Sequence, residues 1–208
     1  IEFLSQWKFQ EEDLSYLASL KNGRGEQFFS NGFLDYLAGL SFTCDVYAPP
    51  EGTILFPHEP MLRIEGPLLQ CQLLESPLLN FMNFQTLIAT KAARVCHAAE
   101  WDPVIEFGLR RAQGPDGGVS ASRAAYIGGC IATSNVLAGK LFDIPVRGTH
   151  AHSWVMAFPD ELSAFQTYAE MMPQDCVLLV DTYQTLEGVK NAIEVGKKLQ
   201  KTGGHLSA

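Results

Sequence analysis

The stretch VIEFGLRRAQGPDGG (104–118) decides the fold, because an apolar strand, a polar segment and a glycine-rich turn follow one another directly. A similar succession recurs in PVRGTHAHSW (145–154) and in CVLLVDTYQT (176–185). Helical periodicity follows each of the three strands, over 120–142, 161–172 and 186–200. Strands that alternate with helices at this spacing predict right-handed βαβ units and a parallel sheet, either doubly wound or the beginning of a barrel.

The residues before this stretch have a different pattern. Two short helices are expected over 11–20 and 32–40, the second with Ser30 as its cap. Further along, alternation with a period of two predicts a small three-stranded meander, with strands over 42–47, 53–56 and 61–66. Apolar helical periodicity then predicts a buried helix pair, divided at Pro77, over 67–75 and 77–99.

These patterns predict an α/β chain with two domains. An α+β domain is expected over residues 1–100, and an incomplete parallel β/α barrel over 101–208. Three βα units cannot close a barrel, because closure needs about eight strands. The chain also begins with Ile1 rather than Met, so we expect it to be the middle of a longer enzyme.

Composition excludes several classes of protein. The 208 residues carry 15 basic and 23 acidic side chains, a net charge of −8, which disfavours nucleic acid and anionic membranes as partners. The most apolar stretch, 68–99, has polar residues at regular intervals and is not expected to span a membrane. The five cysteines include no CxxC pair, which indicates reduced thiols and a cytoplasmic protein.

The carboxyl ends of parallel strands are where functional residues gather in βα folds. Arg110 and Arg111 follow the first strand, and either guanidinium could hold a carboxylate or a phosphate through paired hydrogen bonds. The alternative for these two arginines is a surface ion pair with Glu106 or Asp116.

The second and third strands end in groups that move protons. His150 and His152 are two residues apart, which in an extended segment puts both on one face and suits paired metal ligation or a single catalytic imidazole. A hydrogen-bonded histidine in a packed loop is the structural alternative for each. Asp181 could bind Mg²⁺, orient a histidine or cap the following helix.

Five of these segments together resemble the nicotinate phosphoribosyltransferases, which are type II phosphoribosyltransferases. The matching strings are NFQTLIATKAAR (83–94), EFGLRRAQGPDGG (106–118), TSNVLAGKLF (133–142), GTHAHSW (148–154) and LVDTY (179–183). In addition, FTCDVYAPPEGTILFPHEPMLRIEGP (42–67) is similar to the small β domain of that family. The resemblance extends from about residue 3 to residue 200.

The resemblance implies a reaction and its participants. Nicotinate and phosphoribosyl diphosphate would give nicotinate mononucleotide and diphosphate in the salvage synthesis of NAD. Mg²⁺ would be the cofactor, and ATP, as co-substrate, would be hydrolysed through a phosphohistidine. By its position in the motif that histidine is His152 rather than His150, and the family implies a homodimer.

The resemblance also assigns roles to individual side chains. Phe107 would stack on the pyridine ring, Arg110 would lie against the ring or the phosphates, and Thr149 would contact nicotinate. Arg111 and Asp181 are not assigned by the resemblance, but their places at the strand ends make them candidates for binding phosphate or Mg²⁺. No metal ion held by protein side chains alone is implied.

Ser134 bears on the choice of substrate. In the related nicotinamide phosphoribosyltransferases the matching position is an aspartate, which accepts hydrogen bonds from an amide but repels a carboxylate. Ser134 lacks that repulsion, so the resemblance favours nicotinate over nicotinamide.

Two other functions stay open from the sequence. A metal-dependent hydrolase is one, because an HxH pair after a barrel strand with an aspartate on a neighbouring strand can hold Zn²⁺. The other is a catalytically incomplete fragment or isoform that keeps a dimer interface without turnover.

Overall fold

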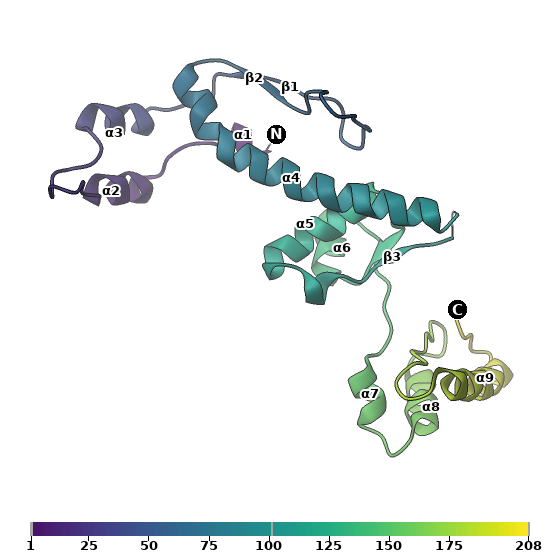
Figure 1. Cartoon of the computed structure of the whole chain (residues 1–208). Coiled ribbons are helices and arrows are strands. Elements are labelled where there is room, and N and C mark those ends of the chain that lie inside the picture. Colours follow the sequence, from purple (N-terminus) through teal and green to yellow (C-terminus); the bar gives the residue numbers. More distant parts are fainter. Residues whose placement is uncertain (1, 101, 208) are drawn as a thin grey trace. The chain divides into compact units, whose positions relative to one another are not determined.

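The structure, a computed structural model, describes residues 2–100 and 102–207 (Figure 1). The chain forms two compact units, Ile1–Phe84 and Gln85–Ala208. The predicted domain division falls at residues 100 and 101, and Trp101 lies outside the described residues, so that division stays a prediction.

The first unit begins with three helices, α1 (Glu2–Ser5), α2 (Glu11–Ser19) and α3 (Asn31–Ala38). The predicted cap of α3 is confirmed, because the Ser30 hydroxyl oxygen accepts a hydrogen bond of 3.3 Å from the backbone N–H of Phe33. The helix α1 was not expected from the sequence. It is a single turn of four residues, too short for periodicity to reveal.

An antiparallel pair of strands follows, β1 (Asp45–Tyr47) and β2 (Arg63–Glu65), with Val46 opposite Ile64. Gln70, a buried residue of the helix that follows β2, hydrogen-bonds to the segment that precedes β1. Its amide nitrogen donates to the Ser41 carbonyl at 3.1 Å, and its amide oxygen accepts from the Thr43 N–H at 3.0 Å.

The predicted middle strand of the meander, over 53–56, is wrong. Ile54 and Phe56 are 81% and 68% exposed, so this segment has no apolar surface to pack on. The Phe56 N–H donates to the Glu59 carboxylate at 2.8 Å, a local bond that takes the place of a strand partner.

The predicted helix pair is also wrong, since α4 (Leu68–Ala98) runs as one helix through Pro77. Proline has a backbone φ that suits a helix, and its missing N–H removes one hydrogen bond, to the Leu73 carbonyl. The turn before it is held by fully buried Leu74. Most other residues of α4 are exposed or half-buried, contrary to the expected burial.

None of the helices in the described part of the chain has the length and apolar character that a bilayer crossing requires.

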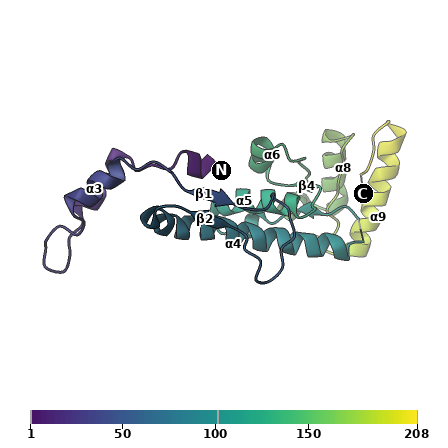
Figure 2. The same ribbon diagram turned by 90° about the horizontal axis from the view of Figure 1, so that it is seen from above.

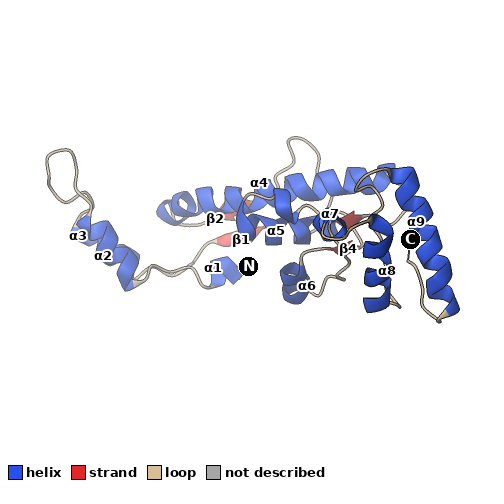
Figure 3. Ribbon diagram, turned by 90° about the horizontal axis from the view of Figure 1, so that it is seen from below, coloured by secondary structure: helices blue, strands red, loops and turns tan. Residues whose placement is uncertain are grey.

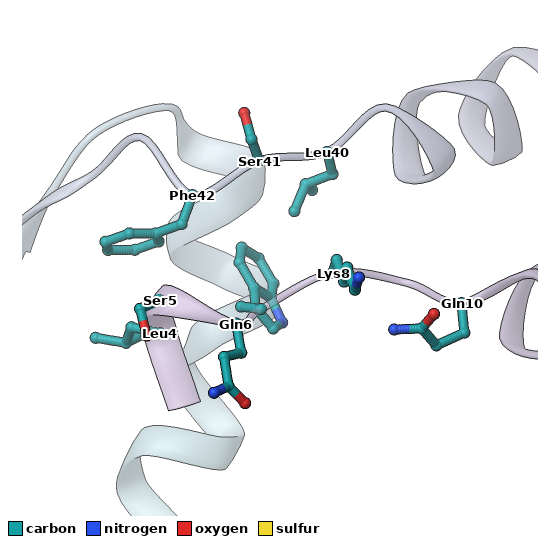
Figure 4. A pocket seen from close by; sticks show the side chains of 9 residues that line it. Leu4, Ser5, Gln6, Lys8, Gln10, Leu40, Ser41 and Phe42 are labelled. Atoms are coloured by element: carbon teal, nitrogen blue, oxygen red, sulfur yellow. The ribbon is translucent and has the colours of Figure 1, made fainter. Parts of the chain in front are cut away.

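A cavity of about 690 Å³ lies in the first unit, between segments 4–10 and 40–42 (Figure 4). The rings of Trp7 and Phe42, both in its lining, meet edge to face at 6.4 Å. Lys8 is the charged side chain among the lining residues. No residue predicted for the active site lines this cavity.

The second unit contains the parallel strands β3 (Ile105–Glu106) and β4 (Ala132–Thr133). Thr133 also pairs in parallel with Val146 through a single bridge. The parallel pairing is therefore confirmed, and β4 is an additional strand that lies between the first and second predicted strands in the chain. The sequence did not reveal β4, because two residues give no alternation and they lie inside a stretch that is otherwise helical.

Helices follow the strands as expected. The first two are α5 (Gly114–Ile127) and α6 (Val136–Phe142), and a short 3₁₀ helix, η1 (Leu109–Arg111), precedes α5. The α5 helix starts in the GPDGG turn, where Gly114 has a φ of 81° and proline occupies the first turn.

The last three helices are α7 (His152–Met156), α8 (Glu161–Met171) and α9 (Thr185–Lys201). Figures 1 and 2 show α8 and α9 side by side, and Figure 3 shows how short the strands are beside the helices. Fully buried Phe165 lies in the core between these helices, together with the following side chains: Val155, Ala164, Cys176 and Val195. The predicted strand over 176–180 is reduced to one bridge, from Cys176 to Leu206.

Candidate active site

The predicted site residues fall into two groups within the second unit. The first group surrounds the ends of β3 and β4: Phe107, Arg110, Arg111 and Ser134. The second group lies around α7 and segment 176–182: Thr149, His152 and Asp181. Among the residues that the structure describes, no hydrogen bond or ion pair joins one group to the other.

The two arginines of the first group are exposed and unpaired in the described part of the chain. The alternative of an ion pair with Glu106 or Asp116 is therefore wrong. Glu106 instead accepts hydrogen bonds from the Ser122 hydroxyl at 2.8 Å and from the backbone N–H of Gly108. Both guanidinium groups are consequently available to an anion.

Ser134 and Phe107 are connected through the sheet. The backbone N–H of Ser134 donates to the Glu106 carbonyl at 2.9 Å, one residue before Phe107. The ring of Phe107 is 49% exposed, which leaves its surface available for stacking. Sequence reasoning did not identify Glu106 as part of this group. The sequence signal that could have identified Glu106 is its position, as an acidic residue near the end of the apolar segment VIEF (104–107).

His152, in the second group, is held between two side chains that follow the segment 176–180. Its Nδ1 lies 3.2 Å from the Thr182 hydroxyl, and its Nε2 lies 3.8 Å from the Asp181 carboxylate. The side chains of His152 and Asp181 are 42% and 56% exposed, so a ligand can reach both. Capping by Asp181 is not observed, because α9 begins at Thr185 after Gln184.

His150 faces a different environment from His152. Its Nε2 accepts a hydrogen bond of 3.2 Å from the Leu179 N–H, and its ring packs against Phe165 and Tyr168, with centroids 5.7 and 4.9 Å away. Burial lowers the pKa of the His150 imidazole, partly opposed by its contact with the Ala151 carbonyl. His150 is thus a neutral structural histidine.

The paired-ligand interpretation of the two histidines conflicts with this geometry. The Nε2 atom of His150 already accepts the N–H of Leu179, so its lone pair is not available to a metal ion. Within residues 2–100 and 102–207, no three His, Cys, Asp or Glu side chains are grouped so as to hold a metal.

The Thr149 side chain makes a structural hydrogen bond within the second unit. Its hydroxyl donates to the Val177 carbonyl at 2.6 Å and so joins the segment before His150 to segment 176–180. The hydroxyl hydrogen is used in this bond, while the oxygen can still accept. Contact between Thr149 and nicotinate stays a prediction.

The buried imidazole predicts a pH dependence of stability. Since the pKa of His150 is lower in the folded chain than its unfolded value of about 6.5, the unfolded chain binds the extra proton first as pH falls. Stability from this residue is complete above pH 6.5 or so and decreases below it, by up to about 1.4 kcal/mol per pH unit. Urea unfolding between about pH 5 and pH 8 measures this slope.

A pair of variants assigns the slope to its source. His150→Gln keeps an acceptor for the Leu179 N–H but does not titrate, so its stability should vary less with pH. Exposed His97→Gln is the matched control and should keep the slope of the unchanged chain. Equal slopes in all three proteins would contradict the assignment to His150.

Comparison with known proteins places the chain in a family. Residues 1–83 match the N-terminal domain of nicotinate phosphoribosyltransferase. The chain is 46% identical over 199 residues to a nicotinate phosphoribosyltransferase of Mycobacterium tuberculosis, covering 96% of this chain and 42% of that protein. It is 51% identical to the one of Bacillus subtilis, over 95% and 39% of the two chains.

Solved structures agree with the sequence comparison. The crystal structure of human nicotinic acid phosphoribosyltransferase matches with a TM-score of 0.85 at 34% identity, over 99% of this chain and 50% of that one. A nicotinate-nucleotide pyrophosphorylase from Pyrococcus furiosus matches with a TM-score of 0.69 at 36% identity, over 74% and 41%. The chain thus spans about half the length, or less, of the proteins it matches.

Parallel βα units of this topology, in a chain that matches the human structure over 99% of its length, define a type II phosphoribosyltransferase fold. The predicted fold class, an α+β region followed by part of a parallel β/α barrel, is confirmed. Two bacterial relatives align with 95% or more of this chain, at 46% and 51% identity. The chain therefore belongs to the nicotinate phosphoribosyltransferase family.

Proposed function

We propose that the protein containing this chain transfers the phosphoribosyl group of phosphoribosyl diphosphate to nicotinate, giving nicotinate mononucleotide and diphosphate. We further propose that ATP hydrolysis is coupled to this transfer through a phosphohistidine at His152. The observation that carries the proposal is the placement of an accessible imidazole between Thr182 and Asp181 at the end of a βα strand segment. Family membership supports the substrate class.

The histidine geometry suits phosphoryl transfer. Asp181 favours the tautomer with its proton on Nε2 of His152, which leaves the lone pair on Nδ1. The Thr182 hydroxyl donates to Nδ1 and turns away when the terminal phosphoryl group of ATP arrives. The bond from Nδ1 to phosphorus then forms as the bond to the ADP oxygen breaks, and Asp181 stabilises the positive charge on the ring.

The glycosyl transfer depends on charge rather than on a protein nucleophile. Diphosphate leaves with several negative charges, so cationic donors near it lower the barrier. Arg110 and Arg111 are unpaired in the described chain and follow the end of β3, which suits them to hold the phosphates. We assign Phe107 to the pyridine ring and Thr149 to its carboxylate.

Mg²⁺ fits these residues as a partner of the substrate phosphates. In such sites the ion takes one or two protein carboxylates and binds phosphate oxygens for the rest. Asp181 offers an exposed carboxylate beside His152 and would be that ligand. When bound, Mg²⁺ neutralises charge on the diphosphate.

The setting of the reaction follows from the same assignment. The product serves the salvage synthesis of NAD, and we propose a homodimer on the basis of the family. Free thiols at all five cysteines support a cytoplasmic location.

The direct test is formation of nicotinate mononucleotide, measured with and without ATP, for this chain and for a version extended at both ends. Turnover in the extended protein that ATP stimulates is the expected result. Turnover with neither protein would contradict the proposed function. Activity confined to the extended protein would support the catalytically incomplete fragment as the description of these 208 residues.

A further inference from the structure

Glu106, the last residue of β3, connects three separate elements through one carboxylate. Its Oε2 accepts the Thr133 hydroxyl of β4 at 2.6 Å and the Ser122 hydroxyl of α5 at 2.8 Å. Its Oε1 accepts the backbone N–H of Gly108, at the start of the loop that carries the arginines. A Cβ atom on Gly108 would lie 2.9 Å from this oxygen, so glycine permits the close approach.

The same residue fixes the backbone on both sides of Ser134. The Ser134 N–H donates to the Glu106 carbonyl at 2.9 Å. The Thr133 hydroxyl, which donates to the Glu106 carboxylate, accepts the N–H of Asn135 at 3.0 Å. Asn135 in turn caps α6 by accepting the Ala138 N–H at 3.2 Å. The backbone is therefore fixed at Ser134 by the Glu106 carbonyl and at Asn135 by the Thr133 hydroxyl, which is itself bonded to the Glu106 carboxylate.

The chemistry of the carboxylate suits this arrangement. An ionised carboxylate only accepts hydrogen bonds, and all three groups around Glu106 are donors. Among the described residues neither Arg110 nor Arg111 pairs with Glu106, and its carboxylate faces these neutral donors. Hydrogen bonds to an ionised acceptor are shorter and stronger than neutral ones, which makes the loop connection stiff.

We propose that Glu106 is a positioning residue that sets the ring of Phe107 and the backbone of Ser134 in register for the pyridine substrate. This inference rests on the proposed function, because it assigns those two residues to nicotinate. It places the effect of Glu106 on substrate binding and selectivity and not on the transfer step.

The test uses Glu106→Gln, which keeps the size of the side chain but replaces one acceptor oxygen by an amide donor. The amide nitrogen cannot accept a hydrogen bond, so either the Gly108 N–H or the two hydroxyls lose their acceptor, depending on which oxygen it replaces. Exposed Glu170→Gln on α8 removes the same charge without touching the network and is the matched control. Both variants are made in this chain and in the extended protein.

Two independent measurements are made. Hydrogen exchange followed by mass spectrometry should be at least about tenfold faster over 107–112 and 133–136 in Glu106→Gln, and unchanged over α8 and α9. The KM for nicotinate in turnover, and its Kd in calorimetric titration, should rise about tenfold, while kcat changes by less than about twofold.

The outcomes separate this inference from the proposed function. Unchanged exchange in both segments would overturn the role of Glu106, as would faster exchange with unchanged KM and Kd. A fall in kcat alone would also overturn it. If the unmodified proteins bind nicotinate without turnover, the proposed function fails while the Kd still decides the role of Glu106. No binding of nicotinate by either unmodified protein would overturn both.

Discussion

His152→Ala should abolish the stimulation by ATP of nicotinate mononucleotide formation, so that the rate with ATP falls to the rate without it. Alanine has no nitrogen to accept the phosphoryl group, and the neighbouring Thr182 and Asp181 cannot replace an imidazole. The measurement is product formation by the extended protein over a range of ATP concentrations. A second measurement, on this chain itself, is incorporation of labelled phosphate from ATP in a form that acid releases and base does not.

The neighbouring histidine provides the control for this experiment. His150→Gln should keep both the ATP stimulation and the labelling, because His150 is buried against Phe165 and bonded to Leu179. Circular dichroism of each variant checks that the fold is retained. Equal loss in the two variants would refute the division of roles between the histidines.

Ser134→Asp should shift substrate preference from nicotinate toward nicotinamide by about tenfold or more in the ratio of kcat/KM. A carboxylate at this position repels the carboxylate of nicotinate and accepts hydrogen bonds from the amide of nicotinamide. The backbone of Ser134 is fixed by its bond to Glu106, so the new side chain cannot easily move away. Initial rates with each substrate at saturating phosphoribosyl diphosphate give the ratio.

An uncharged variant of the same size separates charge from shape. Ser134→Asn should bind nicotinate more weakly through crowding, without the repulsion between like charges, so its selectivity ratio should change less than that of Ser134→Asp. If the two variants had equal ratios of kcat/KM for the two substrates, charge at position 134 would not be the cause of the selectivity.

The order of elements in the second unit was readable from the sequence because its signals are local. Apolar strand segments, the Pro115 turn and the helical periods of α8 and α9 each depend on a few neighbouring residues. The carboxyl ends of the strands could therefore be located, and with them the arginines, the histidines and Asp181.

Local signals failed where an element depended on a distant partner. Segment 53–56 has the alternation of a strand, but a strand forms only where another chain segment pairs with it. Here the Phe56 N–H instead donates to the nearby Glu59 carboxylate. Residues 132–133 do form a strand, although two residues carry no periodicity, because parallel neighbours lie on either side.

By itself the sequence determined the βα succession, the family resemblance and the residue types at the strand ends. The resemblance favoured His152 over His150, but only the tertiary structure gave the physical difference between them, since Leu179 donates to His150 and Thr182 lies beside His152. It also identified Glu106, whose hydroxyl partners lie 16 and 27 residues away. The spacing of residues along a chain indicates its helices, but strand pairing and the protonation and hydrogen bonding of a side chain depend on what folding brings beside them.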